Sequence, residues 1–271
     1  MIKNKYLFFI LVLISAGACS TEETISPIGK DLRPVILGEA NPADSISVKI
    51  FMIQNSASPN ISSVIPMKAE VRILDETGKT VTMLHRKDSV FWHASTHLNP
   101  GESYTLDILT NDNKHIKAQT FIPESFHAFI ESKSLTKDNR QSISLRIADK
   151  NMPGYFVIEC VQELDAQTQK RYLFIDSQDT QTDNYIYNEL PTPTQHLFLH
   201  KKEEQQVITL NIPVEDNCFL QIRKVDPVYY KYLYTYEVQN SNDNIPGLLT
   251  INPHFLGVWG GCNMFSISLS Q

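Results

Sequence analysis

The chain has 271 residues, of which 42% are hydrophobic, and its net charge at pH 7 is −6. This length and apolar content suffice for one large or two ordinary globular domains, and they argue against a largely disordered chain. The excess of acidic residues and the lack of a stripe of Lys and Arg argue against a nucleic-acid partner.

The first 18 residues have the pattern of a secretory signal peptide. Lys3 and Lys5 give it a positive start, and residues 6–14 form an apolar run that is too short to span a bilayer as a mature helix. Small side chains, which a signal peptidase requires, fill residues 15–18. We therefore expect residues 1–18 to be removed on export.

Cys19 follows these small residues directly, in "SAGAC". The segment resembles a lipobox, in which the cysteine thiol receives diacylglycerol, although Ala16 stands where leucine is commonest. The alternative is ordinary cleavage after Ala18 with a chance cysteine behind it. We expect a lipidated Cys19 and a polar tether over residues 19–33, because several acyl chains make a stable membrane anchor.

Three further cysteines are Cys160, Cys218 and Cys262. An exported chain can form disulfides, but an odd number leaves at least one thiol over. Cys160 and Cys218 lie in apolar segments typical of strands, where cysteine is commonly a small hydrophobe.

Residues 34–124 alternate apolar and polar side chains in short segments, which predicts a series of strands. Residues 67–88 predict a hairpin in which Gly78 permits the positive φ of the turn. A Pro-Gly turn then precedes a strand that carries Tyr104.

The segments "KAEVRILDETGKTV", "LNPGESYTLDIL" and "IKAQTFIP" resemble the transthyretin-like, carboxypeptidase-regulatory-like β-sandwich. Its signature is A-x-V-x-I-x-D-x-x-G followed by P-G-x-Y-x-L-x-I. The resemblance implies a β-sandwich over residues 34–124 with Tyr104 in its core. Modules of this class are mostly spacers or binding scaffolds.

Residues 125–271 predict a second β-rich domain, with a long polar loop over residues 176–196 and a final strand around "MFSISL". One helix is expected near residues 227–239, because Asp226 can cap it and Pro227 suits its first position. Helical spacing puts three side chains on one face of this helix and two beside it. The three are Val228, Tyr232 and Tyr236, and the two are Tyr229 and Leu233. The predicted fold class is mainly β, with two β-sandwich-like domains and one short Tyr-rich helix in the second.

Aromatic side chains are the candidate ligand or partner contacts, since Tyr and Trp combine a flat apolar face with a polar edge. The candidates are Tyr229, Tyr232, Tyr236 and Trp259. The alternative is that the tyrosines pack a core, and that "GVWGG" is a tight connection where backbones approach closely.

Catalytic and metal-binding patterns are weak. His93 and His97 would lie about 13 Å apart along a strand, so we expect no metal site there. The chain has no G-x-S-x-G nucleophile motif, and Glu159, Glu163 and Asp165 have the spacing of a solvated face. We expect no enzyme, no metal and no cofactor, and a hydrolase is the least favoured function.

The order of features along the chain resembles the Bacteroidota outer-membrane lipoproteins grouped as domain-of-unknown-function family 4249. Members end with an "N-I-x-G-G-x-G-x-F" style segment, which Asn244, Ile245, Gly247 and Gly257 match and Trp259 matches loosely. The resemblance implies a lipid-anchored outer-membrane protein that faces the cell surface or, alternatively, the periplasm. It also implies a non-catalytic binding or accessory role beside a TonB-dependent receptor in nutrient uptake. The alternative is a structural or adhesive surface lipoprotein.

Glu22 and Glu23 in "STEET" resemble the signal that carries such lipoproteins to the cell surface, although an acidic linker can also serve solubility alone. We predict that protease added to intact cells cleaves the wild-type protein, whereas the double variant Glu22→Ala, Glu23→Ala is protected, as an immunoblot would show. Equal protection of both proteins would contradict an export signal.

Overall fold

The structure is a computed structural model in which the described residues are 32–42, 46–54, 63–137, 140–149, 154–163, 169–171, 180–181, 196–201, 205–213, 218–241 and 255–269. The predicted signal peptide, Cys19, Glu22 and Glu23 lie outside these residues. So do three residues of the family-like segment, which are Asn244, Ile245 and Gly247.

The described residues are mainly β, and their helix is α2 (Pro227–Ser241), which confirms the predicted fold class. The strands of the N-terminal half are β1 (Leu32–Ala40), β2 (Ile46–Gln54), β3 (Ser63–Pro66), β4 (Ala69–Leu74), β5 (Thr80–Arg86), β6 (Phe91–Ala94), β7 (Ser103–Thr110) and β8 (His115–Phe121). Those of the C-terminal half are β9 (His127–Leu135), β10 (Arg140–Ala148), β11 (Gly154–Glu163), β12 (Gln169–Arg171), β13 (Thr180–Gln181), β14 (Leu197–Lys201), β15 (Gln205–Pro213), β16 (Cys218–Val225) and β17 (Leu256–Ser268).

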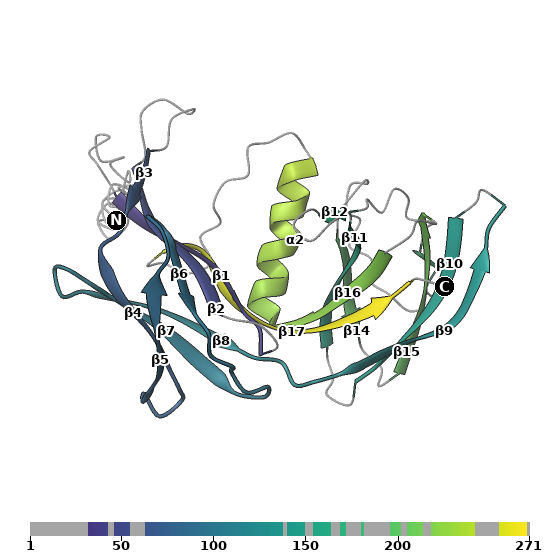
Figure 1. Ribbon diagram of the computed structural model, residues 1–271, viewed down its shortest axis with the longest axis horizontal. Coiled ribbons are helices and arrows are strands. Elements are labelled where there is room, and N and C mark those ends of the chain that lie inside the picture. The colour runs from purple at the N-terminus through teal and green to yellow at the C-terminus, as the bar shows by residue number, and fades with distance from the viewer. Residues whose placement is uncertain are drawn as a thin grey trace, which may run out of the picture.

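One large sheet runs through the whole molecule in the order β12-β11-β16-β17-β1-β2-β6-β5-β4-β7-β8, and β14 and β3 pair with β11 and β2. Strands β1, β2 and β4 to β8 enclose one hydrophobic core, and β11, β14, β16 and β17 pack on a separate sheet, β13-β15-β10-β9, around a second core. Figure 1 shows these two β units at opposite ends, with α2 standing on the concave face between them.

Local sequence patterns account for several of these elements. In β10, Ile143, Leu145 and Ile147 are buried and alternate with more exposed residues, as a strand with one core face requires. Gly78 has a φ of 82° in the turn between β4 and β5, and Tyr104 is buried in the first core. The predicted hairpin and core tyrosine are therefore confirmed.

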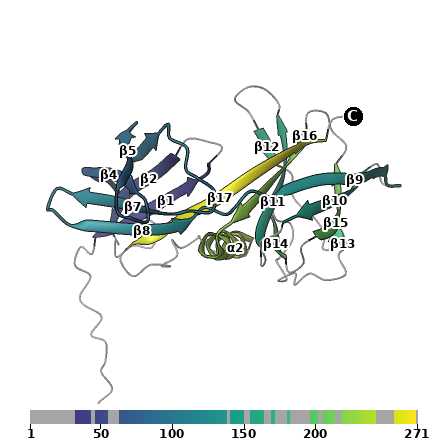
Figure 2. The ribbon, with the colours of Figure 1, turned by 90° about the horizontal axis from the view of Figure 1, so that it is seen from below.

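Strand β17 joins the two units. It pairs parallel with β1, from Val35↔Leu256 to Ala40↔Gly261, and antiparallel with β16, from Phe219↔Ser268 to Val225↔Cys262. Figure 2 shows it crossing the molecule from one unit to the other. The final strand is thus longer than the predicted segment around "MFSISL", and its first part completes the sheet of the N-terminal half. The predicted domain boundary after residue 124 stays a prediction.

Glycines in β17 allow three close approaches. A Cβ on Gly257, which has a φ of +86°, would lie 2.3 Å from the Ile36 carbonyl oxygen. A Cβ on Gly260 would lie 2.1 Å from Cγ of Tyr229, in α2. A Cβ on Gly261 would lie 2.0 Å from the carbonyl oxygen of Phe121, in β8. The interpretation of "GVWGG" as a tight connection is therefore confirmed.

We predict that Gly261→Ala lowers the free energy of unfolding by about 3 kcal/mol, because the new methyl group would overlap backbone that cannot move freely. Gly78→Ala is the matched control, since Gly78 needs a positive φ but has no atom within 4 Å of an added Cβ. It should cost only about 1–2 kcal/mol of backbone strain. Urea unfolding of both variants measures the difference, and equal losses would contradict the close approach.

Candidate functional site

Asp226 fixes the start of α2 to the sheet. Its Oδ1 accepts hydrogen bonds from the backbone N–H groups of Val228 and Tyr229, both at 2.9 Å. Its Oδ2 accepts one from the Gly261 N–H at 2.7 Å and one from the Thr120 hydroxyl at 2.9 Å. Burial raises the pKa of Asp226, although these hydrogen bonds act in the opposite direction. The predicted cap is confirmed, and it also ties α2 to β8 and β17.

The tyrosines of α2 divide between a buried and an exposed side. Tyr229, Tyr230 and Tyr232 are buried, whereas Val228 is 50% and Tyr236 is 40% exposed. The predicted shared face of Val228, Tyr232 and Tyr236 therefore combines one buried side chain with two exposed ones. Aromatic residues occur all around this helix, so spacing alone does not fix the buried side. The cap and the packing of Tyr230 against Phe198 and Tyr155 fix it instead, because they set how the helix lies on the sheet.

A cluster of charged and polar side chains lies on the concave face, beside α2 and between the two units. Arg223 from β16 donates to Oε2 of Glu39 in β1 at 3.1 Å, and it forms an ion pair with Glu159 in β11. The Tyr229 hydroxyl donates to Glu39 at 2.9 Å, and the Cys262 thiol donates to the other Glu39 oxygen at 3.0 Å. These five side chains, which we name the junction cluster, come from β1, β11, β16, β17 and α2.

Protonation in the junction cluster follows from its burial and charges. Burial by itself lowers the pKa of Arg223, but the carboxylates of Glu39 and Glu159 raise it above its ordinary value. Burial raises the pKa of the Tyr229 hydroxyl well above its usual range, and Glu39 raises it further. The pKa of the Cys262 thiol is raised for the same two reasons. Arg223 is therefore charged, and Tyr229 and Cys262 keep their protons.

The structure corrects the expectation of a solvated carboxylate face. The Glu159 residue is only 1% exposed, and His196 lies 3.1 Å from its Oε1. The alternation in β11 turns Glu159 to the concave face, where neighbouring elements and Arg223 cover it. A single glutamate inside the apolar run "YFVIECV" was the available signal. The side chain of Glu163 and all of Asp165 lie outside the described residues.

The four aromatic candidates have different surroundings. Tyr229 and Trp259 are 7% and 2% exposed, Tyr229 in the core beneath α2 and Trp259 in the core of the N-terminal unit. Tyr232 is also 7% exposed, and its ring stacks on that of Tyr236 with 6.3 Å between ring centroids. Burial, and then Tyr236, raise the pKa of Tyr232 to about 12. Of the four, Tyr236 alone offers a large part of its surface to solvent.

The histidines and cysteines singled out from the sequence have structural contacts or are buried. His97 makes a 2.9 Å hydrogen bond through Nδ1 with the carbonyl oxygen of Pro42, away from His93. Cys160, Cys218 and Cys262 are buried, and no disulfide joins these three described cysteines to one another. Within the described residues, no group of three or more His, Cys, Asp and Glu side chains is arranged to hold a metal ion.

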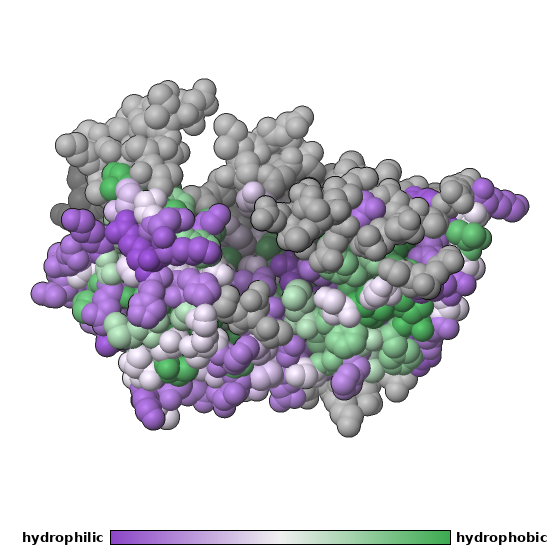
Figure 3. Space-filling view, viewed as in Figure 1, coloured by the Kyte–Doolittle hydropathy of each residue, from purple (hydrophilic) through white to green (hydrophobic). Residues whose placement is uncertain are grey.

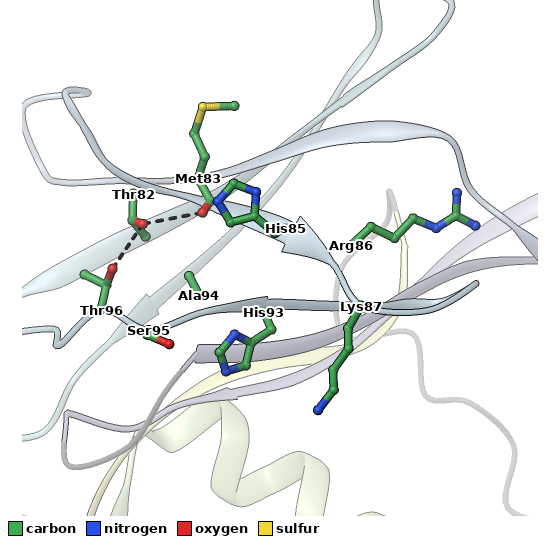
Figure 4. Close-up of a pocket in the computed structure, with 9 residues that line it drawn as sticks. All are labelled: Thr82, Met83, His85, Arg86, Lys87, His93, Ala94, Ser95 and Thr96. Atoms are coloured by element: carbon green, nitrogen blue, oxygen red, sulfur yellow. Dashed lines mark hydrogen bonds between the residues drawn. The ribbon is translucent and has the colours of Figure 1, made fainter.

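Two surface depressions lie on the N-terminal unit. A groove of about 630 Å³ extends from the turn between β4 and β5 over β7 and β8 to the start of α2, with the exposed Phe121 and Val228 among its lining residues. A pocket of about 550 Å³ lies over β5 and β6 and includes His85 and His93 (Figure 4).

On one face of the molecule, the two ends differ in the hydropathy of their surface. Figure 3 shows hydrophilic side chains over much of the N-terminal unit and a gathering of hydrophobic ones over the C-terminal unit. Exposed apolar residues of the C-terminal unit include Phe129, Leu135 and Val207. No helix among the described residues has both the length and the apolar character needed to cross a bilayer.

We predict that Arg223→Ala lowers the free energy of unfolding by about 3–5 kcal/mol, because it leaves Glu159 and Glu39 facing each other without the cation between them. Lys114→Ala is the control, since its ion pair with Asp112 is exposed on both sides and should leave the unfolding midpoint unchanged. Chemical denaturation measures both variants. An Arg223→Ala variant as stable as Lys114→Ala would show that the junction cluster does not hold the units together.

Comparisons with known proteins give a family but no function. The model for "Domain of unknown function (DUF4249)" matches residues 24–252, so Gly257 and Trp259 lie beyond the match. No curated protein matches the chain. Among solved structures, a biofilm-associated protein BSP domain aligns at 11% identity and a TM-score of 0.28, over 88% of this chain and 29% of that one. A putative membrane-anchored protein from Corynebacterium diphtheriae aligns at 10% identity and a TM-score of 0.23, over 71% of this chain and 54% of that one. Because the family model covers most of the sequence, the chain belongs to the DUF4249 family.

Proposed function

We propose that this protein is a cell-envelope lipoprotein that acts as a non-catalytic binding or accessory protein beside a TonB-dependent outer-membrane receptor in nutrient uptake. In this proposal the acylated Cys19 anchors it to the outer membrane, with the folded part facing the cell surface. Lipid anchoring is supported by the signal-like residues 1–18 and the cysteine that follows them. Localisation to the cell surface is supported by the acidic Glu22 and Glu23. Membership of the DUF4249 family is consistent with both.

The observation that supports a non-catalytic role is that the polar groups of the junction cluster are engaged in contacts with one another. A catalytic acid, base or nucleophile has to reach a substrate with a proton or an electron pair available. In the junction cluster Arg223 contacts two carboxylates, and the Cys262 thiol is protonated and donates to Glu39. The buried Asp226 accepts four hydrogen bonds that hold α2 on the sheet. These groups serve the packing of the two units.

Binding is favoured over chemistry by what remains at the surface. The groove beside α2 combines exposed apolar side chains, Phe121 and Val228, with the polar side chains of Asp75, Glu76 and Lys117. Tyr236 adds an exposed ring farther along the same helix. Apolar surface with a few polar groups at its border is typical of recognition sites for ligands or proteins.

The proposal is tested by purifying a C-terminally tagged protein from cross-linked cells of the native organism and identifying its partners by mass spectrometry. A TonB-dependent β-barrel receptor should be recovered with the wild-type protein and with the control variant Ser20→Ala. It should be lost with Cys19→Ser, because the unanchored protein leaves the membrane fraction. Recovery of the protein without any such receptor would contradict the uptake role and favour the structural or adhesive alternative.

A further inference from the structure

A pair of histidines lies on the outer face of the N-terminal unit. In the antiparallel pairing of β5 with β6, His85 is directly opposite His93. Directly opposite residues of two strands project to the same face, with Cβ atoms about 5 Å apart. Both residues line one pocket, and Figure 4 shows His85 on β5 and His93 on the neighbouring β6, with their rings turned to different sides.

The geometry of such a pair suits a metal ion. Imidazole nitrogens bind Zn²⁺ at about 2.0–2.1 Å, so two rings whose Cβ atoms are about 5 Å apart can turn toward one ion between them. His85 is exposed and His93 is half-buried, so both can be reached from solvent. The pocket of about 550 Å³ leaves space for an ion together with its water ligands.

The rest of the pocket supplies oxygen atoms. Thr82, Ser95 and Thr96 line it, and the Thr96 hydroxyl donates to that of Thr82 at 3.1 Å (Figure 4). Hydroxyl groups are weak ligands, but they can accept hydrogen bonds from water molecules bound to an ion. The lining residues include no carboxylate, so the ion would keep exchangeable positions.

Arg86 and Lys87 also line the pocket, so an anionic ligand is the alternative to a metal ion. Arg86 points its guanidinium at the turn, where it donates to the carbonyl oxygens of Asp88 and Ser89 at 2.8 Å. The Lys87 ammonium lies over the Phe91 ring, 5.7 Å from its centroid. Both side chains therefore have contacts within their own turn, which leaves the two imidazoles as the candidate ligands.

We propose that His85 and His93 bind one divalent transition-metal ion between them. Two imidazoles with open positions fit Cu²⁺ best, then Ni²⁺ and Zn²⁺, because affinity at nitrogen ligands rises to Cu²⁺ and falls again at Zn²⁺. The site is distinct from the pattern of His93 and His97, and it does not depend on the proposed function.

The test is isothermal titration of the purified full-length protein with Cu²⁺ alone, and with Ni²⁺ alone, at neutral pH. The wild-type protein should bind Cu²⁺ more tightly than Ni²⁺. His85→Ala and His93→Ala should each weaken binding by roughly tenfold or more, since each removes one of the two imidazoles. His97→Ala is the matched control, because His97 faces Pro42, and it should bind as the wild type does.

A second readout separates this pair from other imidazoles in the chain. The electron paramagnetic resonance spectrum of the Cu²⁺ complex should show coupling to two imidazole nitrogens, and one should disappear in His85→Ala and in His93→Ala. Wild-type affinity in the double variant His85→Ala, His93→Ala would overturn the proposal, as would a wild-type protein that binds neither ion. Circular dichroism confirms that the variants remain folded, and both changed residues lie on the outer face of the sheet.

Discussion

The fold depends on one strand, β17, which passes so close to β1, α2 and β8 that almost no space is left for side chains at the contacts. β17 runs beside β1, under α2 and against β8, and at each contact it carries a glycine. Any side chain at Gly260 or Gly261 would overlap Tyr229 or the backbone of Phe121. Because the same strand continues into the sheet of the C-terminal unit, these contacts decide how the two units are joined. The short sequence "GVWGG" therefore determines how the two units are joined.

The junction cluster is a consequence of this arrangement. Because β17 lies between β1 and β16, and α2 packs on this part of the sheet, Glu39, Arg223 and Glu159 meet beside α2. Arg223 and Glu159 are largely buried there, whereas the side chain of Glu39 is 29% exposed. Buried charges are tolerated only when they are paired and hydrogen-bonded, and this requirement explains why Arg223 pairs with Glu159 and Glu39. Tyr229 and Cys262 add hydrogen bonds to the half-buried Glu39. The members come from both units, so the charge pairing favours the arrangement that brings them together.

Local chemistry predicted a good part of this structure. Asp226 and Pro227 marked the start of α2, Gly78 marked a hairpin turn, and the alternation of Ile143, Leu145 and Ile147 marked β10. Each of these features is decided by neighbours within a few residues. The candidate site was less accessible to sequence reasoning. Spacing left the buried side of α2 undecided. Glu159 was assigned to solvent but is buried, because burial depends on which surfaces meet and not on spacing.

The sequence by itself determined the β class, the helix and its cap, and the membership of a family, since turn geometry, capping and alternation are properties of short segments. The tertiary structure decided which distant segments meet. Glu39 and Cys262 are 223 residues apart and share a hydrogen bond, and His93 is paired across two strands with His85. The pairing of strands decides which distant residues come together. The register of that pairing depends on which faces of the strands are buried, and no single segment determines this.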